Sequence, residues 1–303
     1  MTQTATALST TPTPTKQRGP RTKALIRFVK TQPLGVLGLI IILVLLGAGT
    51  FADFVAPYDP LETRFDALLQ PPSWSHLMGT DGYGRDIFSR LMHGARPALL
   101  LGLSTALIGS ILGGAIGVTS AYFGGKVDAA IQRCIDVMLS IPLIVAAMVV
   151  VAVLGRNEVG GVDINLMIAI ILPYVPVIAR VMRSAALSVR ASPYIDAARA
   201  LGFSHARVIF CHMVPNLISP WLVLVSAFTA QTILLEASLS YLGLGVAEPA
   251  PAWGLMLSGV SMEVFSSAPW VVVFPGLAIS LAVFSFSLLG DALRDALDPK
   301  FHR

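Results

Sequence analysis

Charge is scarce in this chain. Only 13% of its 303 residues are Asp, Glu, Lys or Arg, about half of the 25% that is usual in soluble globular domains. Hydrophobic residues, by contrast, make up 55% of the chain. So apolar a composition excludes an ordinary water-soluble domain and indicates a protein that resides in a membrane.

The sequence also lacks the motifs of the common catalytic sites. It contains no G-x-x-x-x-G-K-[ST] phosphate loop, and its nearest glycine cluster, GTDGYGRD at 79–86, has no lysine. Neither H-E-x-x-H nor G-x-S-x-G occurs, and the five histidines show no metal-ligand spacing. Cys134 and Cys211 are not spaced as a metal pair and are expected to be free thiols. We therefore expect no catalytic residue, cofactor or metal in this chain, and no ATP hydrolysis by it alone.

Long apolar runs are what the sequence has in abundance. A helix needs about 20 mostly apolar residues to cross a bilayer, and six such stretches occur, at 34–55, 97–123, 135–154, 164–182, 217–242 and 270–289. Pro142, Pro173 and Pro176 lie within spans, where we predict bends rather than ends. Residues 243–269 are predicted to be an exposed loop with short helical pieces rather than a seventh span. The fold class is therefore an all-α integral membrane protein with six transmembrane helices.

The positions of Lys and Arg orient these spans. With a cytoplasmic N-terminus, 16 of the 21 Lys and Arg lie in cytoplasmic segments, namely 1–33, 124–134, 180–216 and 291–303. This distribution follows the positive-inside bias and predicts that both termini are cytoplasmic. The basic, Thr- and Pro-rich tail at 1–33 is expected to be largely disordered. The apolar run after it is longer than a signal-peptide core and is expected to stay as an anchor.

A stripe of small residues runs along the second predicted span. Gly109, Gly113 and Gly117 recur every four positions, and Thr105 and Ala121 extend the ladder. Such a stripe forms a groove into which another helix can press closely. We therefore predict a packing face, whose partner helix belongs either to this chain, the simpler expectation, or to another subunit.

Glu236 lies well inside the fifth predicted span. Because a carboxylate at the bilayer centre costs about 2.5 to 3.5 kcal/mol even on insertion scales, its position calls for an explanation. It either lines a substrate path or pairs with a polar side chain on a neighbouring helix. Intramembrane ionisable residues usually face the interior of the helix bundle, which favours the pairing.

The most polar part of the chain between spans is YIDAARALGFSHARVIFCHMVPN, at 194–216. Ser192 is a candidate N-cap, Pro193 suits a first helical turn and Asp196 suits the positive end of the helix dipole. Gly202 suits a left-handed stop. These residues predict one short cytoplasmic helix that ends in a bend.

A second short helix is predicted to follow, with Ser204 as its cap and Pro215 as its interruption. On the first helix Ala197, Ala198 and Leu201 share a small apolar flank. That flank fits a groove on another protein, or it belongs to an amphipathic helix that lies on the membrane surface. The residue pattern by itself favours neither alternative.

This segment resembles the EAA loop of permease subunits in ABC importers. Asp196-Ala197-Ala198, Gly202, His212 and Val214-Pro215 follow its order and spacing, with Asp196 in place of Glu and His212 in place of Ile. In that family the glutamate-alanine-alanine helix docks on a cytoplasmic ATPase. The resemblance implies that the ATPase-coupling residues of this chain are Asp196, Ala197, Ala198, Leu201, Gly202, Arg207 and Pro215.

The likeness covers about residues 30–303. HLMGTDGYGRDIFSRLMHGAR (76–96), SLSYLGLG (238–245), PAWG (251–254), APWVVVFPGLAI (268–279) and GDALRDALDP (290–299) resemble, in order, the C-type permease subunit of dipeptide, oligopeptide and nickel ABC importers. Ser287 replaces the Asn that usually precedes LLGD. The resemblance implies a type I permease fold, with a tail at 1–33, a first helix and external segment at 34–96, a core at 97–290 that contains the cytoplasmic coupling loop 184–216, and a tail at 291–303.

The resemblance also implies the rest of the machine. The chain would form half of a pore in a bacterial inner membrane, with a B-type permease subunit, two ATPase subunits that bind ATP, and an extracytoplasmic solute-binding protein. Nucleic acid is not an expected partner. Di- or oligopeptides are the expected cargo, with nickel or another small solute as the alternative. A secondary transporter predicts several ionisable groups near the midplane and inverted repeats. Glu236 is the one ionisable residue well inside a predicted span, and no inverted repeat is found.

Overall fold

The computed structural model describes residues 31–159, 162–259 and 264–297. The predicted disordered tail at 1–33 and the end of the tail at 291–303 therefore lie mostly outside the described residues. The long helices are α2 (Pro33–Thr50), α4 (Ile87–Phe123), α5 (Gly125–Leu139), α6 (Leu143–Leu154), α7 (Ile164–Arg190), α10 (Val214–Tyr241) and α13 (Trp270–Leu297). Shorter elements are α3 (Ala52–Val55), the 3-10 turn η1 (Phe65–Ala67), α8 (Pro193–Ala200), α9 (His205–Arg207), the π-helical turn η2 (Val208–Met213) and α11 (Trp253–Met256).

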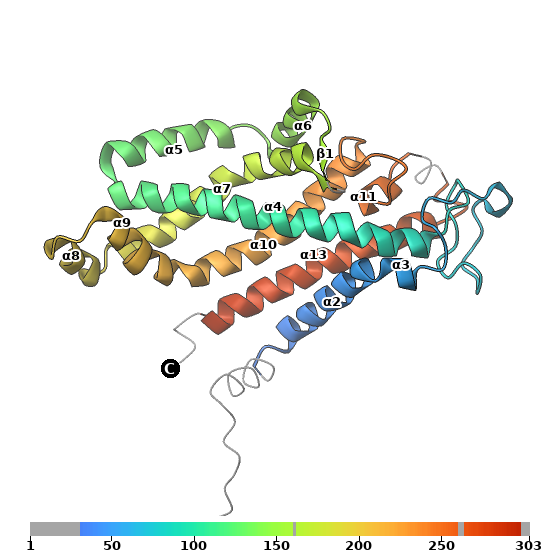
Figure 1. The fold of residues 1–303 in the computed structure, drawn as a ribbon, viewed down its shortest axis with the longest axis horizontal. Coiled ribbons are helices and arrows are strands. Elements are labelled where there is room, and N and C mark those ends of the chain that lie inside the picture. The colour runs from blue at the N-terminus through green and yellow to red at the C-terminus, as the bar shows by residue number, and fades with distance from the viewer. Residues whose placement is uncertain (1–30, 160–161, 260–263, 298–303) are drawn as a thin grey trace, which may run out of the picture.

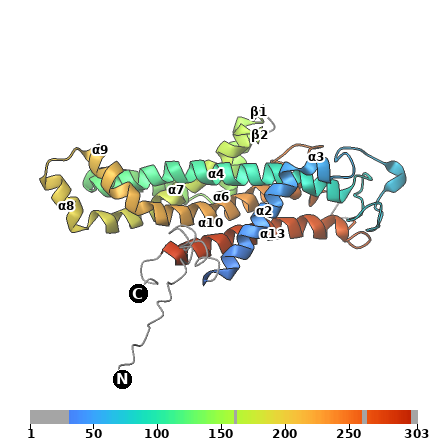
Figure 2. The same ribbon diagram turned by 60° about the horizontal axis from the view of Figure 1, so that its bottom comes forward.

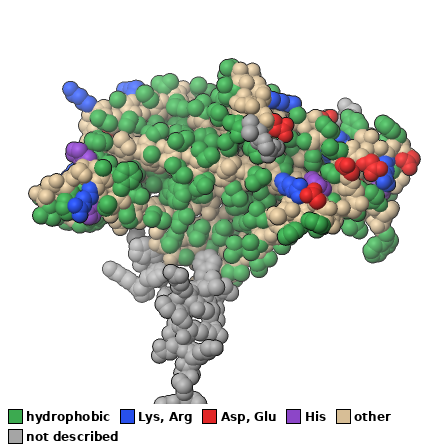
Figure 3. Space-filling view, viewed as in Figure 1, with side chains coloured by type: hydrophobic (Ala, Val, Ile, Leu, Met, Phe, Trp, Pro, Cys, Tyr) green, Lys and Arg blue, Asp and Glu red, His purple; other side chains and the backbone are tan. Residues whose placement is uncertain are grey.

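The all-α expectation is confirmed apart from one small hairpin. Strands β1 (Glu158–Val159) and β2 (Val162–Asp163) pair antiparallel just before α7. Figures 1 and 2 show α4, α7 and α10 running side by side along the bundle, with α2 and α13 packed along one side of it. Hydrophobic side chains cover the middle of the visible surface, and charged side chains gather toward its two ends (Figure 3). This is the distribution expected of a bundle that spans a bilayer.

Five helices of the described residues are long and apolar enough to cross a membrane, and one further crossing, the third in chain order, is broken. The third predicted span consists of α5 and α6, which are bent by 85° at residues 140–142. The prediction that Pro142 only bends a continuous helix was wrong, because α5 ends at Leu139 and Pro142 is the N-cap of α6. A proline disfavours helical backbone at the residue before it, here Ile141. Pro173 and Pro176, in contrast, lie inside the continuous helix α7, as predicted.

The second span begins at Ile87 rather than at the predicted Pro97, which lies inside α4. The Asp86 side chain caps this helix by accepting a hydrogen bond from the backbone N–H of Ser89 at 2.8 Å. Sequence reasoning placed the first ten residues of this helix in the outer loop because of their arginines. One of these arginines, Arg90, is in fact buried, and its guanidinium donates a hydrogen bond to the carbonyl of Pro60 at 2.9 Å.

The glycine stripe of α4 packs against α7 of the same chain, which answers the question that the sequence left open. A Cβ at Gly113 would lie 2.8 Å from the carbonyl oxygen of Val175, and one at Gly117 would lie 2.4 Å from that of Ala179. Real side chains do not approach backbone so closely, so only glycine allows this contact. Helices α4 and α7 therefore touch backbone to backbone along this stripe.

Residues 243–269 are less exposed than predicted. Trp253, in the PAWG motif, is 2% exposed, and its indole N–H donates to the carbonyl of Leu91 in α4 at 3.0 Å. Gly254 is also buried, with the backbone of Ala237 close beside it. Distant contacts with α4 and α10, which no local pattern reveals, fold α11 into the outer half of the core.

Candidate functional site

The predicted cytoplasmic loop 184–216 comprises the end of α7, α8, α9, η2 and the start of α10. Its helices α8 and α9 lie at one end of the bundle (Figure 1). The predicted first helix is α8, which begins at Pro193 with Ser192 in the N-cap position, although the Ser192 side chain makes no capping hydrogen bond. The predicted left-handed bend is confirmed, since Gly202 has a φ of +78°. The N–H of Gly202 donates to the carbonyl of Arg199 at 2.9 Å, which closes the last turn of α8.

The predicted second helix exists but does not stop at Pro215. The Ser204 hydroxyl caps α9 by accepting from the N–H of Arg207 at 3.4 Å, and the helix then continues through η2 into α10. Pro215 lies in the first turn of α10, where a missing N–H is tolerated. The side-chain amide of Asn216 donates to the carbonyl of His212 at 2.8 Å in the turn before it. The sequence did not reveal the π-helical turn η2. Such turns are frequent at functional sites.

The ATPase-coupling residues predicted from the resemblance do not all share one surface. Asp196, Ala197, Leu201 and Gly202 are exposed at the tip of the loop, and Leu201 is 74% exposed. Ala198 is 5% exposed and packs into the core, so it does not share the exposed surface of Ala197 and Leu201, and its coupling role stays a prediction. The helical period explains this, because Ala198 shares the inward face with Ile195, three residues earlier.

Arg207 and Pro215 are both exposed, but Arg207 is held in place by a stack of rings. Its guanidinium lies 4.1 Å from the ring centroid of Phe203, and Phe203 stacks on His212 with 7° between the ring planes. Phe210, in η2, is 70% exposed on the same part of the loop. The sequence analysis did not select Phe210 as a candidate coupling residue, although an aromatic residue within a polar stretch was a signal that could have identified it.

Glu236 is 1% exposed, in the interior of the bundle. Its carboxylate accepts a hydrogen bond from the Ser240 hydroxyl at 2.7 Å, and Ser240 Oγ in turn accepts from the N–H of Val246 at 3.2 Å. The polar partner predicted for Glu236 is therefore present, but it lies one turn along the same helix, not on a neighbouring helix. The SLSYLGLG motif brings these groups together, since the chain turns back after α10 at Gly243, whose φ is +77°.

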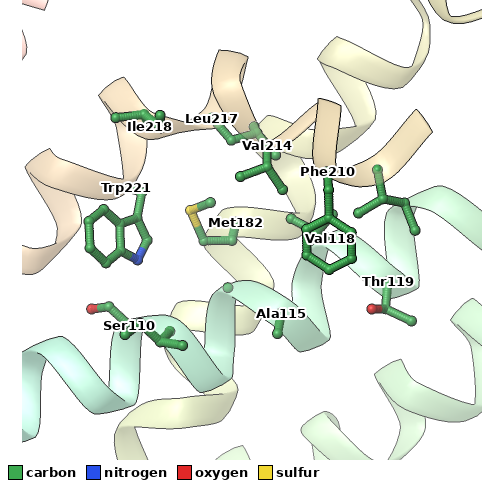
Figure 4. Close-up of a pocket in the computed structure, with 13 residues that line it drawn as sticks. Ser110, Ala115, Val118, Thr119, Met182, Phe210, Val214, Leu217, Ile218 and Trp221 are labelled. Atoms are coloured by element: carbon green, nitrogen blue, oxygen red, sulfur yellow. The ribbon is translucent and has the colours of Figure 1, made fainter. Parts of the chain in front are cut away.

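An apolar cavity of about 380 Å³ lies beside the cytoplasmic loop. Figure 4 shows its lining, which comes from α4, α7, η2 and α10 and includes Met182, Phe210 and Trp221. The lining side chains with hydroxyl groups are Ser110 and Thr119. Such a cavity can accept an apolar group but offers no acid, base or nucleophile for chemistry.

The opposite end of the bundle carries a folded outer cap, residues 56–86. His76 Nδ1 and Asp86 Oδ1 lie 2.9 Å apart, and Arg85 donates to Asp81 at 2.7 Å. These side chains are buried although all of them can carry charge, so their pairing offsets the cost of removing them from water. The cap forms the rigid end of α4 on the outer side.

Metal chemistry finds no support in the part of the chain that the structure describes. Within it, no group of three or more His, Cys, Asp or Glu side chains could hold a metal ion. Cys134 and Cys211 are free and exposed, as expected. The distinctive features of this part of the chain are the broken span, the buried Glu236 and the exposed cytoplasmic loop.

Comparison with known proteins agrees with this description. Residues 109–303 match the family model described as "Binding-protein-dependent transport system inner membrane component", and residues 20–72 match "N-terminal TM domain of oligopeptide transport permease C". The chain is 42% identical to the dipeptide transport system permease protein DppC of Escherichia coli K12, over 90% of this chain and 91% of that protein. It is 40% identical to the protein of the same name in Alkalihalophilus pseudofirmus, over 90% and 88% of the two chains. It is also 40% identical to the di/tripeptide transport system permease protein DppC of Pseudomonas aeruginosa, over 87% of each.

Proposed function

This chain belongs to the family of inner membrane components of binding-protein-dependent transport systems, and from that premise we propose that it forms half of the pore of an ATP-driven peptide importer. It is a multi-pass membrane protein and a permease subunit, not an enzyme, because ATP hydrolysis in this family belongs to separate ATPase subunits. Its relatives are named as dipeptide and di/tripeptide permeases, which supports di- or oligopeptides as the cargo.

The exposed tip of the cytoplasmic loop is the observation that carries the coupling role. Leu201 places an apolar side chain, 74% exposed, directly before the bend at Gly202, and Asp196 and Ala197 are also exposed. These exposed residues belong to the segment that resembles the ATPase-docking helix of the EAA loop, and this resemblance supports a surface that another protein covers. Ile195 and Ala198 hold the inner face of α8 in the core, so the outer face is presented in a fixed orientation. The partner that this arrangement suits is an ATPase subunit.

Coupling then follows from rigid-body motion. When ATP binding closes two ATPase subunits, the docked α8 is displaced with them, and the helices attached to it must follow or separate from it. Half of a pore needs another half, for which we propose a B-type permease subunit. The outer cap lies where a solute-binding protein would deliver the cargo. All of these partners are proposed on the strength of family membership.

Reconstitution of the complete transporter tests the proposal. The tagged chain, purified gently from its native membrane, is expected to bring a second permease and P-loop ATPases with it. Proteoliposomes of this complex should accumulate radiolabelled dipeptide when ATP is inside and the solute-binding protein is added outside. Replacing ATP by a non-hydrolysable analogue is the matched control. Accumulation of nickel but not dipeptide would contradict the proposed peptide cargo but not the proposal of an ATP-driven importer. Uptake without ATP, by the chain alone, would favour a secondary transporter.

A further inference from the structure

A cluster of aromatic and basic side chains surrounds the cytoplasmic end of α4. Tyr122 Oη and His205 Nδ1 lie 2.7 Å apart in a hydrogen bond, and the Tyr122 ring is 2% exposed. The Arg199 guanidinium lies 4.6 Å from the centroid of the same ring. Tyr122 therefore holds one side chain from α8 and one from α9, the two helices on either side of the Gly202 bend.

Arginines also satisfy the last carbonyls of α4. Arg190, at the end of α7, donates to the carbonyl of Ala121 at 2.7 Å, and Arg199 donates to that of Tyr122 at 3.4 Å. The final carbonyls of a helix have no partner within it and carry the negative end of its dipole, so cations there are favourable. At Gly124, a Cβ would lie 2.7 Å from Arg190 Nη1, so glycine leaves the space that this guanidinium fills.

These contacts join α4 to three consecutive pieces of the cytoplasmic loop. Arg190 comes from the end of α7, Arg199 from α8 and His205 from α9. Any displacement of α8 and α9 must carry the end of α4 with it or break the Tyr122 contacts. Since α4 has 37 residues, it is about 55 Å long and connects this end directly with the outer cap.

We propose that Tyr122 and His205 are positioning residues that pass the displacement of the cytoplasmic loop to α4, and through α4 to the outer side of the pore. This inference rests on the proposed function, because it assumes that an ATPase moves the loop. Arg199 supports the ring of Tyr122 from its face, and the hydrogen bond to His205 fixes its edge. The two contacts together tie the Tyr122 side chain to α8 through its ring face and to α9 through its hydroxyl.

Tyr122→Phe in the assembled transporter tests the inference, because it removes the hydroxyl and leaves the ring under Arg199. ATPase subunits should still co-purify and hydrolyse ATP, while dipeptide uptake per ATP falls roughly three- to ten-fold. His205→Ala should have the same effect, and combining the two should add little, since both remove one hydrogen bond. His205→Asn should restore uptake, because its amide can still bond the Tyr122 hydroxyl.

Tyr174→Phe is the matched control. It also removes one buried tyrosine hydrogen bond, the 3.2 Å bond from the Tyr174 hydroxyl to the carbonyl of Gln231, but far from the loop. Uptake per ATP that falls equally in Tyr174→Phe and Tyr122→Phe, or that stays at the wild-type level in Tyr122→Phe, overturns the inference. A wild-type chain that binds no ATPase, or transports without ATP, would instead refute the proposed function.

Discussion

Gly117 of α4 lies so close to Ala179 of α7 that a Cβ on the glycine would stand 2.4 Å from the alanine's carbonyl oxygen. The same glycine would also bring a Cβ within 2.8 Å of the Arg183 backbone nitrogen. The contact joins the helix that reaches the outer cap with the helix that leads into the cytoplasmic loop. Substitutions at this face should therefore affect stability and coupling together.

Gly117→Ala is expected to destabilise the protein, since the added methyl group must push the two backbones apart at a cost of about 1 to 3 kcal/mol. Gly114→Ala, in the same helix, is the matched control because its Cβ would find its nearest neighbour at an ordinary 3.7 Å. Alanine is the better helix former at both positions. Thermal unfolding in detergent should show a lower midpoint for Gly117→Ala only. Equal midpoints for the two variants would contradict the close contact.

Gly202→Val should disturb the bend of the cytoplasmic loop. A φ of +78° is costly for a β-branched residue, by roughly 1 to 2 kcal/mol, although the space around this glycine is open. We expect normal insertion into the membrane, weakened ATPase co-purification and reduced uptake. Gly202→Asn should be tolerated better, because Asn adopts the left-handed region more readily. Normal uptake by the Val variant would count against the docking role.

Glu236→Gln tests whether the buried carboxylate is structural. The side-chain carbonyl of Gln can still accept the hydrogen bond from Ser240, so folding and uptake should both stay near wild type. Glu236→Leu leaves the Ser240 hydroxyl without this acceptor. It should reduce the free energy of unfolding by about 1 to 3 kcal/mol and so lower the unfolding midpoint. A Gln variant that folds and assembles but does not transport would show that the charge itself has a role in the substrate path.

The Asp53 carboxylate next to α4 should give a pH-dependent contribution to stability. It pairs with Arg96 at 2.7 Å and with His93 at 3.1 Å. The hydrogen bond from Arg96, with a smaller contribution from His93, holds the pKa of the Asp53 carboxyl below its ordinary value. A carboxyl with a lowered pKa in the folded state stabilises that state above its unfolded pKa and loses the effect as the pH falls.

Asp53→Asn should therefore melt below wild type near pH 7, and the two unfolding midpoints should converge as the pH falls below about 4. Raising the salt concentration should narrow the difference as well, since the pair is exposed. A difference that persists unchanged at low pH would mean that the side chain acts through packing rather than through its charge.

Local sequence determined a large part of this protein. The spans followed from the length of apolar runs, because a helix must bury about 20 apolar residues to cross the bilayer wherever it lies in the fold. The bend at Gly202 and the helix starts at Pro193 and after Ser204 followed from backbone preferences of single residues. The glycine stripe on α4 likewise predicted a close contact with another helix.

The tertiary structure decided what depends on residues far apart in the chain. Ala198 faces the core, and the Trp253 indole reaches the carbonyl of Leu91 in α4. The hydrogen bond between Tyr122 and His205 joins residues 83 positions apart. Hydropathy and capping act over a few residues and can be seen in the sequence, whereas burial and hydrogen-bond partners depend on which helices pack together. The sequence alone determined that this chain spans a membrane and carries a bent helix pair between two of its spans, but only the packing decided which side chains of that pair face outward.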